Sequence, residues 1–338
     1  MQRCFALAKL GAGNVAPNPM VGAVLVHNDR IVGEGYHKQY GEAHAEVNCI
    51  LSVSDEDIHL IHSATMYVSL EPCAHYGKTP PCADLIISKK IPEVVIGCRD
   101  SFKEVAGKGI QKLNDAGVRV TTGILEKEAL ELNRGFFTFH NYKRPYITLK
   151  WAQSANNKIA ASGDARLMIS NDITNRLVHK WRSEEAAILV GTNTALKDDP
   201  SLTTRYWKGN NPIRLVIDKE LKLPQHLRLF DGTVHTIVFN NSKDLQGDTM
   251  YIKLSNESNY IPQIMERLLQ LNIQSVLVEG GAQLLQSFID EDIWDEARII
   301  TNNELQVPGG LQAPELKNFK QLYSEEIQSD TVRYFKHV

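Results

Sequence analysis

The sequence contains no run of about 18 apolar residues, so we expect no segment that spans a membrane. It also has no excess of basic residues, since 37 Lys and Arg stand against 40 Asp and Glu, for a formal net charge of −3. Proteins that bind a nucleic-acid backbone are normally basic, so we expect no nucleic-acid partner. The first five residues lead into a mixed segment without the apolar core of a signal peptide.

Cysteine is scarce: the chain has five, an odd number, all in the first third of the sequence. This is not the pattern of a disulfide framework, and it favours a reducing, cytoplasmic location. The chain also lacks low-complexity segments and repeats of 20–50 residues, so it does not form a solenoid.

A chain of 338 residues exceeds the size at which one hydrophobic core usually stops growing, so we expect two domains. Segments typical of strands alternate with segments typical of helices in both halves, which indicates α/β architecture and a three-layer first domain. A polar segment with Pro145 marks the joint, and we place the domains at residues 1–142 and 145–338.

Hydrophobic patterning and turn residues predict the elements of each half. In the first half we expect helices over residues 5–10, 44–51, 82–89, 109–116 and 126–139, and strands over 20–27, 31–35, 65–70, 93–98 and 118–121. In the second half we expect strands over 146–153, 187–191, 214–218, 234–240, 275–279 and 297–301, and helices over 172–181, 262–271 and 282–289.

Two short motifs in the first half carry the chemistry: His44-Ala45-Glu46, and Glu71-Pro72-Cys73 followed by Pro81-Cys82. One imidazole and two thiolates are the ligands of a catalytic zinc that keeps its fourth position for water. The order His-x-Glu and then Pro-Cys is that of zinc nucleobase deaminases, although here the second cysteine lies further along the chain. We therefore predict that His44, Cys73 and Cys82 bind Zn²⁺.

Glu46 is not needed as a ligand and is predicted to be catalytic. Zinc lowers the pKa of a bound water from about 15.7 towards about 7. Glu46 would take a proton from this water and pass it to the leaving amino group of an amidine-like ring carbon. A single histidine or cysteine is more often an ordinary helical residue or a buried thiol than a metal ligand. The occurrence of all three in this order favours a metal site. A structural zinc would normally have a fourth protein ligand.

These motifs, together with Pro17-Asn18-Pro19-Met20-Val21-Gly22 and Gly33-Glu34-Gly35-Tyr36-His37, resemble the bifunctional deaminase–reductases of riboflavin biosynthesis. The resemblance covers nearly the whole chain. Its most specific part is the long insert between Cys73 and Cys82, because tRNA adenosine and cytidine deaminases place these cysteines closer together.

The resemblance implies the activity of both halves. The first would be a cytidine-deaminase-like domain that deaminates a small pyrimidine ribotide, diaminohydroxyphosphoribosylaminopyrimidine. The second would be a dihydrofolate-reductase-like domain that uses NADPH to reduce the ribosyl group of the deaminated product to ribityl. Asn18, His75 and Lys78 are then candidate substrate residues, with Asn18 on the pyrimidine ring and the other two near the ribose phosphate.

The second half contains a Gly-Gly turn, Gly280-Gly281, at a predicted strand-to-helix junction. Such a turn suits a pyrophosphate, but it also occurs in simple connections and is not the Rossmann motif. The resemblance implies the following cofactor-binding residues: Ser154, Ser170, Thr194, Asp198, Gly281, Ala282, Gln283 and Leu284. It implies the following substrate-binding residues: Met168, Arg182, Leu202, Arg205 and Glu279.

A guanidinium binds phosphate through two parallel hydrogen bonds, so Arg182 and Arg205 suit a sugar phosphate, although each alone is more often a surface ion pair. Hydride transfer depends mainly on aligning two bound molecules, so no lone catalytic residue is expected in this half.

The chain departs from the family pattern in the reductase half. Where the family usually reads Ser-x-Asp-Gly-Lys, this chain has Ser154-Ala155-Asn156-Asn157-Lys158, and an aromatic residue is common where Met168 stands. In the deaminase half, Asp100-Ser101-Phe102-Lys103 replaces the usual Asp-Pro-Asn-Pro.

Two rival hypotheses remain from the sequence. In the first, the chain is a nucleoside or tRNA deaminase with an unrelated nucleotide-binding domain and weak or no reductase activity. In the second, it is a degenerate protein that binds a nucleotide or a partner without catalysing reduction. Enzymes of this class are often homo-oligomers, and we expect the same here.

Overall fold

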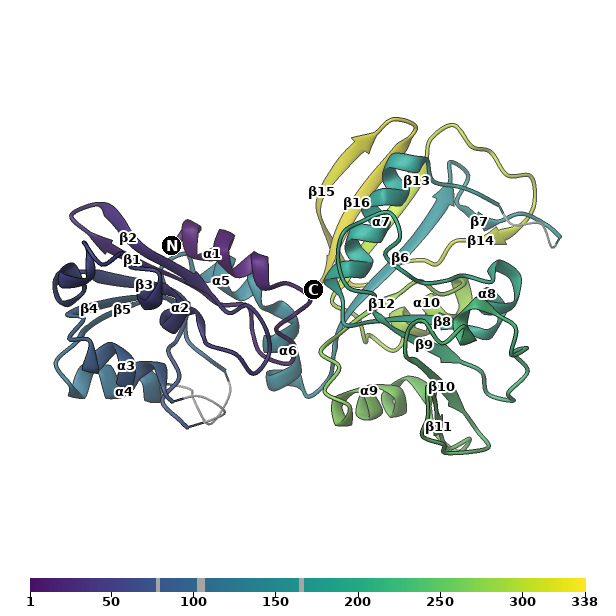
Figure 1. Cartoon of the computed structure of the whole chain (residues 1–338). Helices are drawn as coiled ribbons and strands as arrows, with labels where there is room; N and C mark the ends of the chain where they lie inside the picture. Colours follow the sequence, from purple (N-terminus) through teal and green to yellow (C-terminus); the bar gives the residue numbers. More distant parts are fainter. Residues whose placement is uncertain (77–79, 102–106, 164–166) are drawn as a thin grey trace. The chain divides into compact units, whose positions relative to one another are not determined.

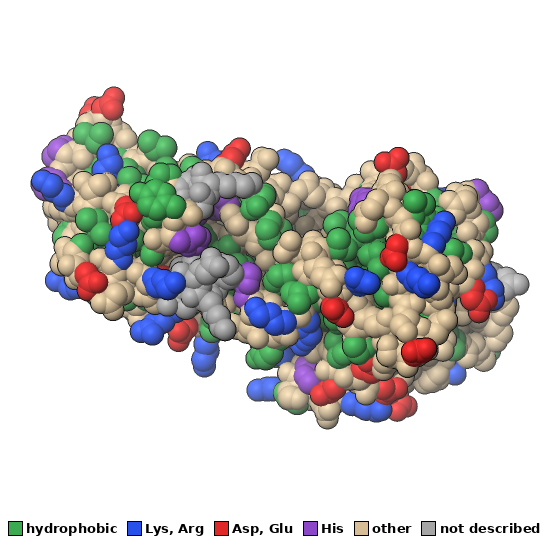
Figure 2. All heavy atoms as spheres, turned by 90° about the horizontal axis from the view of Figure 1, so that it is seen from below, with side chains coloured by type: hydrophobic (Ala, Val, Ile, Leu, Met, Phe, Trp, Pro, Cys, Tyr) green, Lys and Arg blue, Asp and Glu red, His purple; other side chains and the backbone are tan. Residues whose placement is uncertain are grey.

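The computed structural model describes residues 1–76, 80–101, 107–163 and 167–338 (Figure 1). The chain forms two compact units, Met1–Lys143 and Arg144–Val338. Each unit has its own central sheet and its own hydrophobic core. Within the described ranges, no helix has the length and apolar character needed to cross a bilayer. Basic and acidic side chains are interspersed on the face drawn in Figure 2.

The first unit is built on a five-stranded sheet with the order β2-β1-β3-β4-β5. Strand β1 runs antiparallel to both neighbours, while β3, β4 and β5 are parallel. The strands are β1 (Gly22–His27), β2 (Arg30–Tyr36), β3 (Thr65–Leu70), β4 (Glu93–Cys98) and β5 (Arg119–Thr122).

Helices cover both faces of this sheet (Figure 1). On one face α2, α3 and α4 pack through side chains such as Ile86 and Leu113 against Met66 of β3. On the other face α1, α5 and α6 contribute residues that include Ala129 and Phe136. The helices are α1 (Gln2–Ala8), α2 (Ala45–Leu51), α3 (Cys82–Ser88), α4 (Lys108–Asp115), α5 (Glu126–Leu132) and α6 (Arg134–Tyr142), with 3-10 turns η1 (Lys9–Gly11) and η2 (Ile58–Ser63). The predicted three-layer arrangement is therefore present.

The single helix predicted over residues 126–139 is wrong. The chain forms two helices, α5 and α6, that meet at Asn133, whose φ of −116° and ψ of 30° are not helical. The Asn133 side chain is buried and hydrogen-bonds the backbone of Met20, 113 residues away. An asparagine that bonds a distant backbone is a tertiary contact, and hydrophobic periodicity carries no sign of it.

The second unit is built on a nine-stranded sheet with the order β11-β10-β9-β8-β12-β6-β13-β16-β15. The strands from β11 to β13 are parallel, and the hairpin of β15 and β16 adds two antiparallel strands at the β13 edge. The strands of this sheet are β6 (Tyr146–Ser154), β8 (Ala187–Gly191), β9 (Ile213–Ile217), β10 (Thr236–Asn240), β11 (Thr249–Lys253), β12 (Ser275–Val278), β13 (Glu296–Asn302), β15 (Phe319–Ile327) and β16 (Asp330–His337). Two short strands, β7 (Lys158–Ala160) and β14 (Leu311–Gln312), pair with each other.

Helices again lie on both faces. One face of the sheet, with Ile147 and Leu149 of β6, packs against α9 and α10. The other face, with Ile188 and Leu277, packs against α7. The helices are α7 (Asp172–Glu184), α8 (Thr192–Asp198), α9 (Tyr260–Gln270) and α10 (Ala282–Asp290), with the 3-10 turn η3 (Arg228–Phe230). Lys150 lies between residues that face α9 and α10, so the two-residue period of a strand directs it to the α7 face.

Sequence patterning missed α8, β11 and the β15–β16 hairpin. Strand β15 is exposed along almost its whole length, so it shows no alternation of apolar and polar residues. Helix α8 buries only Ala195, which is too little for a periodic pattern. Both elements depend on their neighbours: β15 pairs with β16, which pairs with β13, and α8 follows the carboxyl end of β8.

Candidate functional sites

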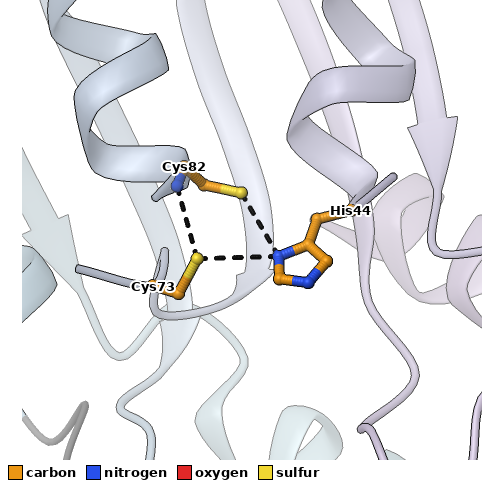
Figure 3. A group of neighbouring side chains, drawn as sticks. All are labelled: His44, Cys73 and Cys82. Carbon is orange, nitrogen blue, oxygen red and sulfur yellow. Dashed lines mark hydrogen bonds between the residues drawn. The ribbon is translucent and has the colours of Figure 1, made fainter. Parts of the chain in front are cut away.

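Three elements bring the zinc motif together in the first unit. His44 is the N-cap of α2, Cys73 follows β3, and Cys82 is the first residue of α3. Figure 3 shows the imidazole of His44 and the side chains of the two cysteines pointing toward one another. These three residues are the group of potential metal ligands found in the described part of the chain, with ligand atoms within 4.8 Å of one another.

The distances fit a zinc ion. The Nδ1 of His44 lies 3.6 Å from the Sγ of Cys73 and 3.4 Å from the Sγ of Cys82. In a tetrahedral site with Zn–N of about 2.0 Å and Zn–S of about 2.3 Å, nitrogen and sulfur ligands stand about 3.5 Å apart. The three atoms therefore have the spacing that one shared ion requires, with Nδ1 as the histidine donor.

The two thiols differ in their protonation. The backbone N–H of Cys82 donates to the Sγ of Cys73 at 3.3 Å. A hydrogen bond from the Cys82 side chain, with a further one from His44, lowers the pKa of Cys73 to about 4. The same contact with Cys73 raises the pKa of Cys82. These contacts favour the thiolate of Cys73, which is the form that binds metal.

Glu46 lies beside this group in the first turn of α2 and is 3% exposed. Burial raises the pKa of its carboxyl group, and a nearby negative Cys73 raises it further. The Glu46 carboxyl also hydrogen-bonds with Cys82. A buried carboxyl with a raised pKa beside three potential metal ligands has the properties of a general acid–base group.

A second carboxylate, Glu71, supports the loop that carries Cys73. The sequence motifs did not predict this role. Its oxygens accept four backbone N–H groups: Asp100 at 3.2 Å, Gly107 at 3.1 Å, Gly109 at 3.0 Å and Ile110 at 3.3 Å. A Cβ on Gly109 would lie 1.9 Å from the carbonyl oxygen of Pro72, so only glycine allows α4 to approach so closely. Glu71 therefore fixes the segment before Cys73 against the start of α4.

The structure places Asn18 near the metal ligands. Asn18 Nδ2 lies 3.1 Å from the Nε2 of His37, a buried residue, and the His37 ring is 5.3 Å from the ring of His44. His75, also a candidate substrate residue, is exposed two positions after Cys73. Lys78 lies outside the described residues.

In the second unit the candidate cofactor and substrate residues follow three adjacent parallel strands. Ser154 ends β6, Glu279 follows β12, and α8 follows β8. Because β8, β12 and β6 are neighbours in that order, their carboxyl ends meet at one edge of the sheet. Ligands of open α/β sheets bind at this edge.

Two of the candidate cofactor residues meet at this edge. Gly281 is the N-cap of α10, and a Cβ placed on it would lie 3.2 Å from the hydroxyl oxygen of Thr194 in α8. The following residues form the first turn of α10, whose backbone N–H groups point outward at the helix start: Ala282, Gln283 and Leu284. Ser154 is fully buried, Asp198 closes α8, and Ser170 directly precedes the N-cap of α7.

Arg182 and Glu279 bind each other. Arg182 Nε and Nη2 each donate to Glu279 at 2.8 Å, and Arg182 Nη1 donates to the carbonyl of Thr203 at 3.2 Å. The ammonium of Lys150 on β6, whose side chain is 12% exposed, lies 3.6 Å from Glu279. Burial acts to raise the pKa of Glu279, but the positive charges of Arg182 and Lys150 outweigh it and lower this pKa to about 2. Lys150 was not predicted, although a lysine within an apolar strand is a usable signal.

Two of the remaining candidates, Leu202 and Arg205, lie on the segment whose Thr203 carbonyl accepts a hydrogen bond from Arg182. Leu202 is buried in the left-handed region with φ of 50°, and exposed Arg205 donates to the hydroxyl of Thr203 at 2.9 Å. His179, one turn before Arg182 on α7, is 1% exposed. Met168 is 62% exposed.

Both halves of the chain match known protein families. Residues 1–98 match the model of the cytidine and deoxycytidylate deaminase zinc-binding region, and residues 145–305 match that of the RibD C-terminal domain. The riboflavin biosynthesis protein RibD of Aquifex aeolicus is 38% identical over 301 residues, which cover 87% of this chain and 83% of that protein. RibD of Bacillus amyloliquefaciens is 40% identical over 307 residues, covering 88% of this chain and 81% of the relative.

The chain belongs to the RibD family of riboflavin biosynthesis proteins. The resemblance inferred from its motifs is confirmed. A solved structure of a diaminohydroxyphosphoribosylaminopyrimidine deaminase/5-amino-6-(5-phosphoribosylamino)uracil reductase from Thermotoga maritima is 36% identical, with a TM-score of 0.91, and covers 100% of this chain and 97% of that chain. RibD of Acinetobacter baumannii is 29% identical with a TM-score of 0.88 and covers 99% of this chain and 97% of that chain.

These matches confirm the fold class, a cytidine-deaminase-like zinc domain followed by an α/β reductase domain of the RibD type. They do not favour a nucleoside or tRNA deaminase fused to an unrelated domain, because RibD proteins match across both units.

The segment after β6, where Asn156 and Asn157 depart from the usual RibD pattern, forms a hydrogen-bonded turn. Asn157 takes φ of 59°, a left-handed conformation that glycine adopts freely and asparagine tolerates. Asn156 Oδ1 accepts from the hydroxyl of Ser154 at 2.7 Å and from the N–H of Val307 at 3.1 Å, and its Nδ2 donates to the carbonyl of Val307 at 2.9 Å. The Asn156 side chain therefore holds the hydroxyl of Ser154 in this turn.

Proposed function

We propose that this chain catalyses two steps of riboflavin biosynthesis, one in each unit. The first is the hydrolytic, zinc-dependent deamination of diaminohydroxyphosphoribosylaminopyrimidine. The second is the NADPH-dependent reduction of the ribosyl group of 5-amino-6-(5-phosphoribosylamino)uracil to ribityl. Membership of the RibD family supports both steps. The observation that carries the proposal is the meeting of His44 Nδ1 with two cysteine sulfurs beside buried Glu46.

His44, Cys73 and Cys82 would hold the zinc in the first unit. Bound zinc supplies a water of lowered pKa as the nucleophile. Glu46 takes one proton from this water and delivers a proton to the amino nitrogen, so that water adds to the ring carbon and ammonia leaves. The low exposure of Glu46 keeps bulk water from competing for these protons.

Substrate recognition in the first unit is assigned to residues around the metal. Asn18, held next to His37, would bind the pyrimidine ring. His75, together with Lys78, would bind the ribose phosphate, because both lie in the insert between the two cysteine ligands.

In the second unit NADPH would lie at the carboxyl edge of the sheet, with its phosphates near the start of α10. Thr194 and Gly281, which the fold brings together, would contact it along with the other candidate cofactor residues. The charged group formed by Lys150, Arg182 and Glu279 would face the ribose, whose hydroxyl oxygens suit ammonium and guanidinium donors. Arg205, Leu202 and Met168 would complete the substrate side.

We further propose that the partners of this chain are small molecules alone and that it works in the cytoplasm as a homo-oligomer. The balance of 37 basic and 40 acidic residues supports the absence of a nucleic-acid partner. Five cysteines, all unpaired, suit a reducing compartment.

A substrate panel tests this proposal. Zinc-loaded protein is given the pyrimidine ribotide, cytidine or adenosine, and ammonia release is measured. The deaminated product is then supplied with NADPH, whose absorbance is followed. We expect ammonia from the ribotide alone and oxidation of NADPH by the product. Ammonia from cytidine or adenosine at an equal rate would contradict the deaminase assignment, and unchanged NADPH would contradict the reductase assignment.

A further inference from the structure

Asn133 occupies an unusual position between two helices. Its backbone interrupts the run from α5 to α6, and its side chain is 5% exposed. The amide oxygen accepts the N–H of Met20 at 2.8 Å, and the amide nitrogen donates to the carbonyl of Met20 at 2.9 Å. One side chain therefore satisfies both backbone groups of a single distant residue, as a neighbouring strand would.

The consequence for the preceding segment is a fixed backbone. Pro19, whose ring restricts φ, connects Met20 to Asn18. The N–H of Asn18 also donates to the carbonyl of Val15 at 2.8 Å. Because only one stiff residue separates Asn18 from the peptide that Asn133 holds, the position of Asn18 depends on Asn133.

A second contact sets the direction of the Asn18 amide. His37 Nδ1 lies 3.1 Å from the carbonyl of Ala43, which accepts only, so in the neutral ring the hydrogen is on Nδ1. The Nε2 of His37 is then an acceptor, and the nitrogen of the Asn18 amide donates to it at 3.1 Å. The amide oxygen is the acceptor that Asn18 offers to a ligand.

We propose that Asn133 is a positioning residue of the deaminase site, which holds Asn18 so that its amide oxygen accepts an N–H of the substrate ring. This would select rings that carry an N–H next to the reacting amidine carbon. The proposal rests on the deaminase function and on the ring contact assigned to Asn18 above. It adds a residue that lies beyond the zinc-binding region, at the break between two helices, and acts through the loop before β1.

A double-mutant cycle tests the proposal. Asn133→Ala, Asn18→Ala and the double variant are prepared as full-length chains and assayed for ammonia release from diaminohydroxyphosphoribosylaminopyrimidine. We expect each single variant to raise KM by about 10-fold, the worth of about one hydrogen bond, with kcat changed far less. The double variant should be no worse than Asn18→Ala alone, because residues that act through one contact are not additive.

Three controls separate positioning from folding. Zinc content should equal that of the wild type, reduction of 5-amino-6-(5-phosphoribosylamino)uracil should be unchanged because it belongs to the other unit, and Asn114→Ala, at an exposed asparagine of α4, should have no effect. Asn133→Asp keeps the size of the side chain and the acceptor for the Met20 N–H but loses the donor to the Met20 carbonyl. It therefore tests the positioning role if Asn133→Ala does not fold. We expect it to raise KM as well.

The outcomes are distinct. Additive effects of Asn133→Ala and Asn18→Ala, a loss of zinc in parallel with KM, or an unchanged KM in both Asn133 variants would overturn the positioning role. An unchanged KM in Asn18→Ala would overturn it too, by removing the contact on which it depends, while the deaminase function would stand. Only a wild type that releases no ammonia from the ribotide would contradict that function.

Discussion

At the scale of single residues, the buried carboxyl of Glu46 determines what the first unit can catalyse. His44, Cys73 and Cys82 are proposed to hold the metal, and Glu46, a buried carboxyl beside them, is proposed to move protons between water and a leaving nitrogen. Its position at the start of α2 also explains why His44 and Glu46 act on the same point: both reach over the end of the helix.

We predict that Glu46→Gln keeps zinc and loses ammonia release by about 10²- to 10⁴-fold, the usual contribution of a general acid–base group. Zinc content and ammonia release are measured on the same sample. Glu56→Gln, at an exposed glutamate after α2, is the control and should behave as the wild type. A Glu46→Gln chain with near-normal turnover would show that the protons move by another route.

Glu279 gives a prediction about pH. Its pKa in the folded chain is about 2, below the ordinary value of 4.5, so it stabilises the fold while ionised. This contribution is complete above about pH 5 and is lost as the pH falls from there towards 2. Glu279→Gln leaves Arg182 and Lys150 without their buried counter-charge, and we expect it to lower the free energy of unfolding by about 3 kcal/mol at pH 7.

Urea unfolding of the wild type and of Glu279→Gln between pH 7 and pH 3 provides the measurement. The difference between the two chains should be constant down to about pH 5 and shrink below it. Glu266→Gln, at an exposed position of α9, is the matched control. A difference that grows as the pH falls would mean that Glu279 is not the ionised partner of Arg182.

Single residues also show the limit of sequence reasoning. The order of His44, Cys73 and Cys82 was enough to predict that they meet, because metal ligands have characteristic spacing. Arg182 was expected to suit a phosphate, and its pairing with Glu279, 97 residues away, depends on which strand and helix lie side by side. Lys150 and Asn133 were missed for the same reason: their partners are set by the tertiary fold.

At the scale of elements, the start of α4 is tied to the loop that carries Cys73. Four backbone N–H groups donate to the Glu71 carboxylate, as the start of a helix can do for an anion. The loop that carries Cys73 is therefore anchored by an element that contributes no ligand.

We predict that Glu71→Gln lowers the free energy of unfolding of the first unit by about 2 to 3 kcal/mol, because the amide nitrogen would face buried N–H donors. The same variant should release zinc to a chelator faster than the wild type. Glu128→Gln, on the exposed side of α5, is the control for both measurements. Unchanged stability and zinc retention would mean that the loop holds its shape without Glu71.

Elements with a clear apolar face were predictable, and β3 (Thr65–Leu70) and β4 (Glu93–Cys98) were predicted with the bounds that they have. Elements that depend on neighbours were not. The C-terminal hairpin exists because β16 continues the sheet beyond β13, and its outer strand has no buried face from which it could be recognised.

At the scale of the whole molecule, each unit has its own core and its own predicted site. The sequence favoured two α/β domains, but it could not order the nine strands of the second sheet, because strand order is a property of long-range pairing. That order is what brings the candidate cofactor residues after β8, β12 and β6 to one edge.

We predict that the loss of a zinc ligand affects one unit alone. Cys73→Ala should abolish metal binding and ammonia release and lower the melting temperature of the first unit by at least about 5 °C, since a bound ion stabilises the folded state. NADPH oxidation with the deaminated substrate should keep its kcat and KM. Loss of both activities would show that the second unit depends on the metal of the first.

The most direct test of the central claim is a zinc titration of the metal-free chain with ammonia release from diaminohydroxyphosphoribosylaminopyrimidine as the readout. We predict that activity rises in proportion to bound zinc and saturates at one ion per chain, and that Cys82→Ala neither binds the ion nor gains activity. Full ammonia release by the metal-free chain, or by Cys82→Ala, would contradict the account.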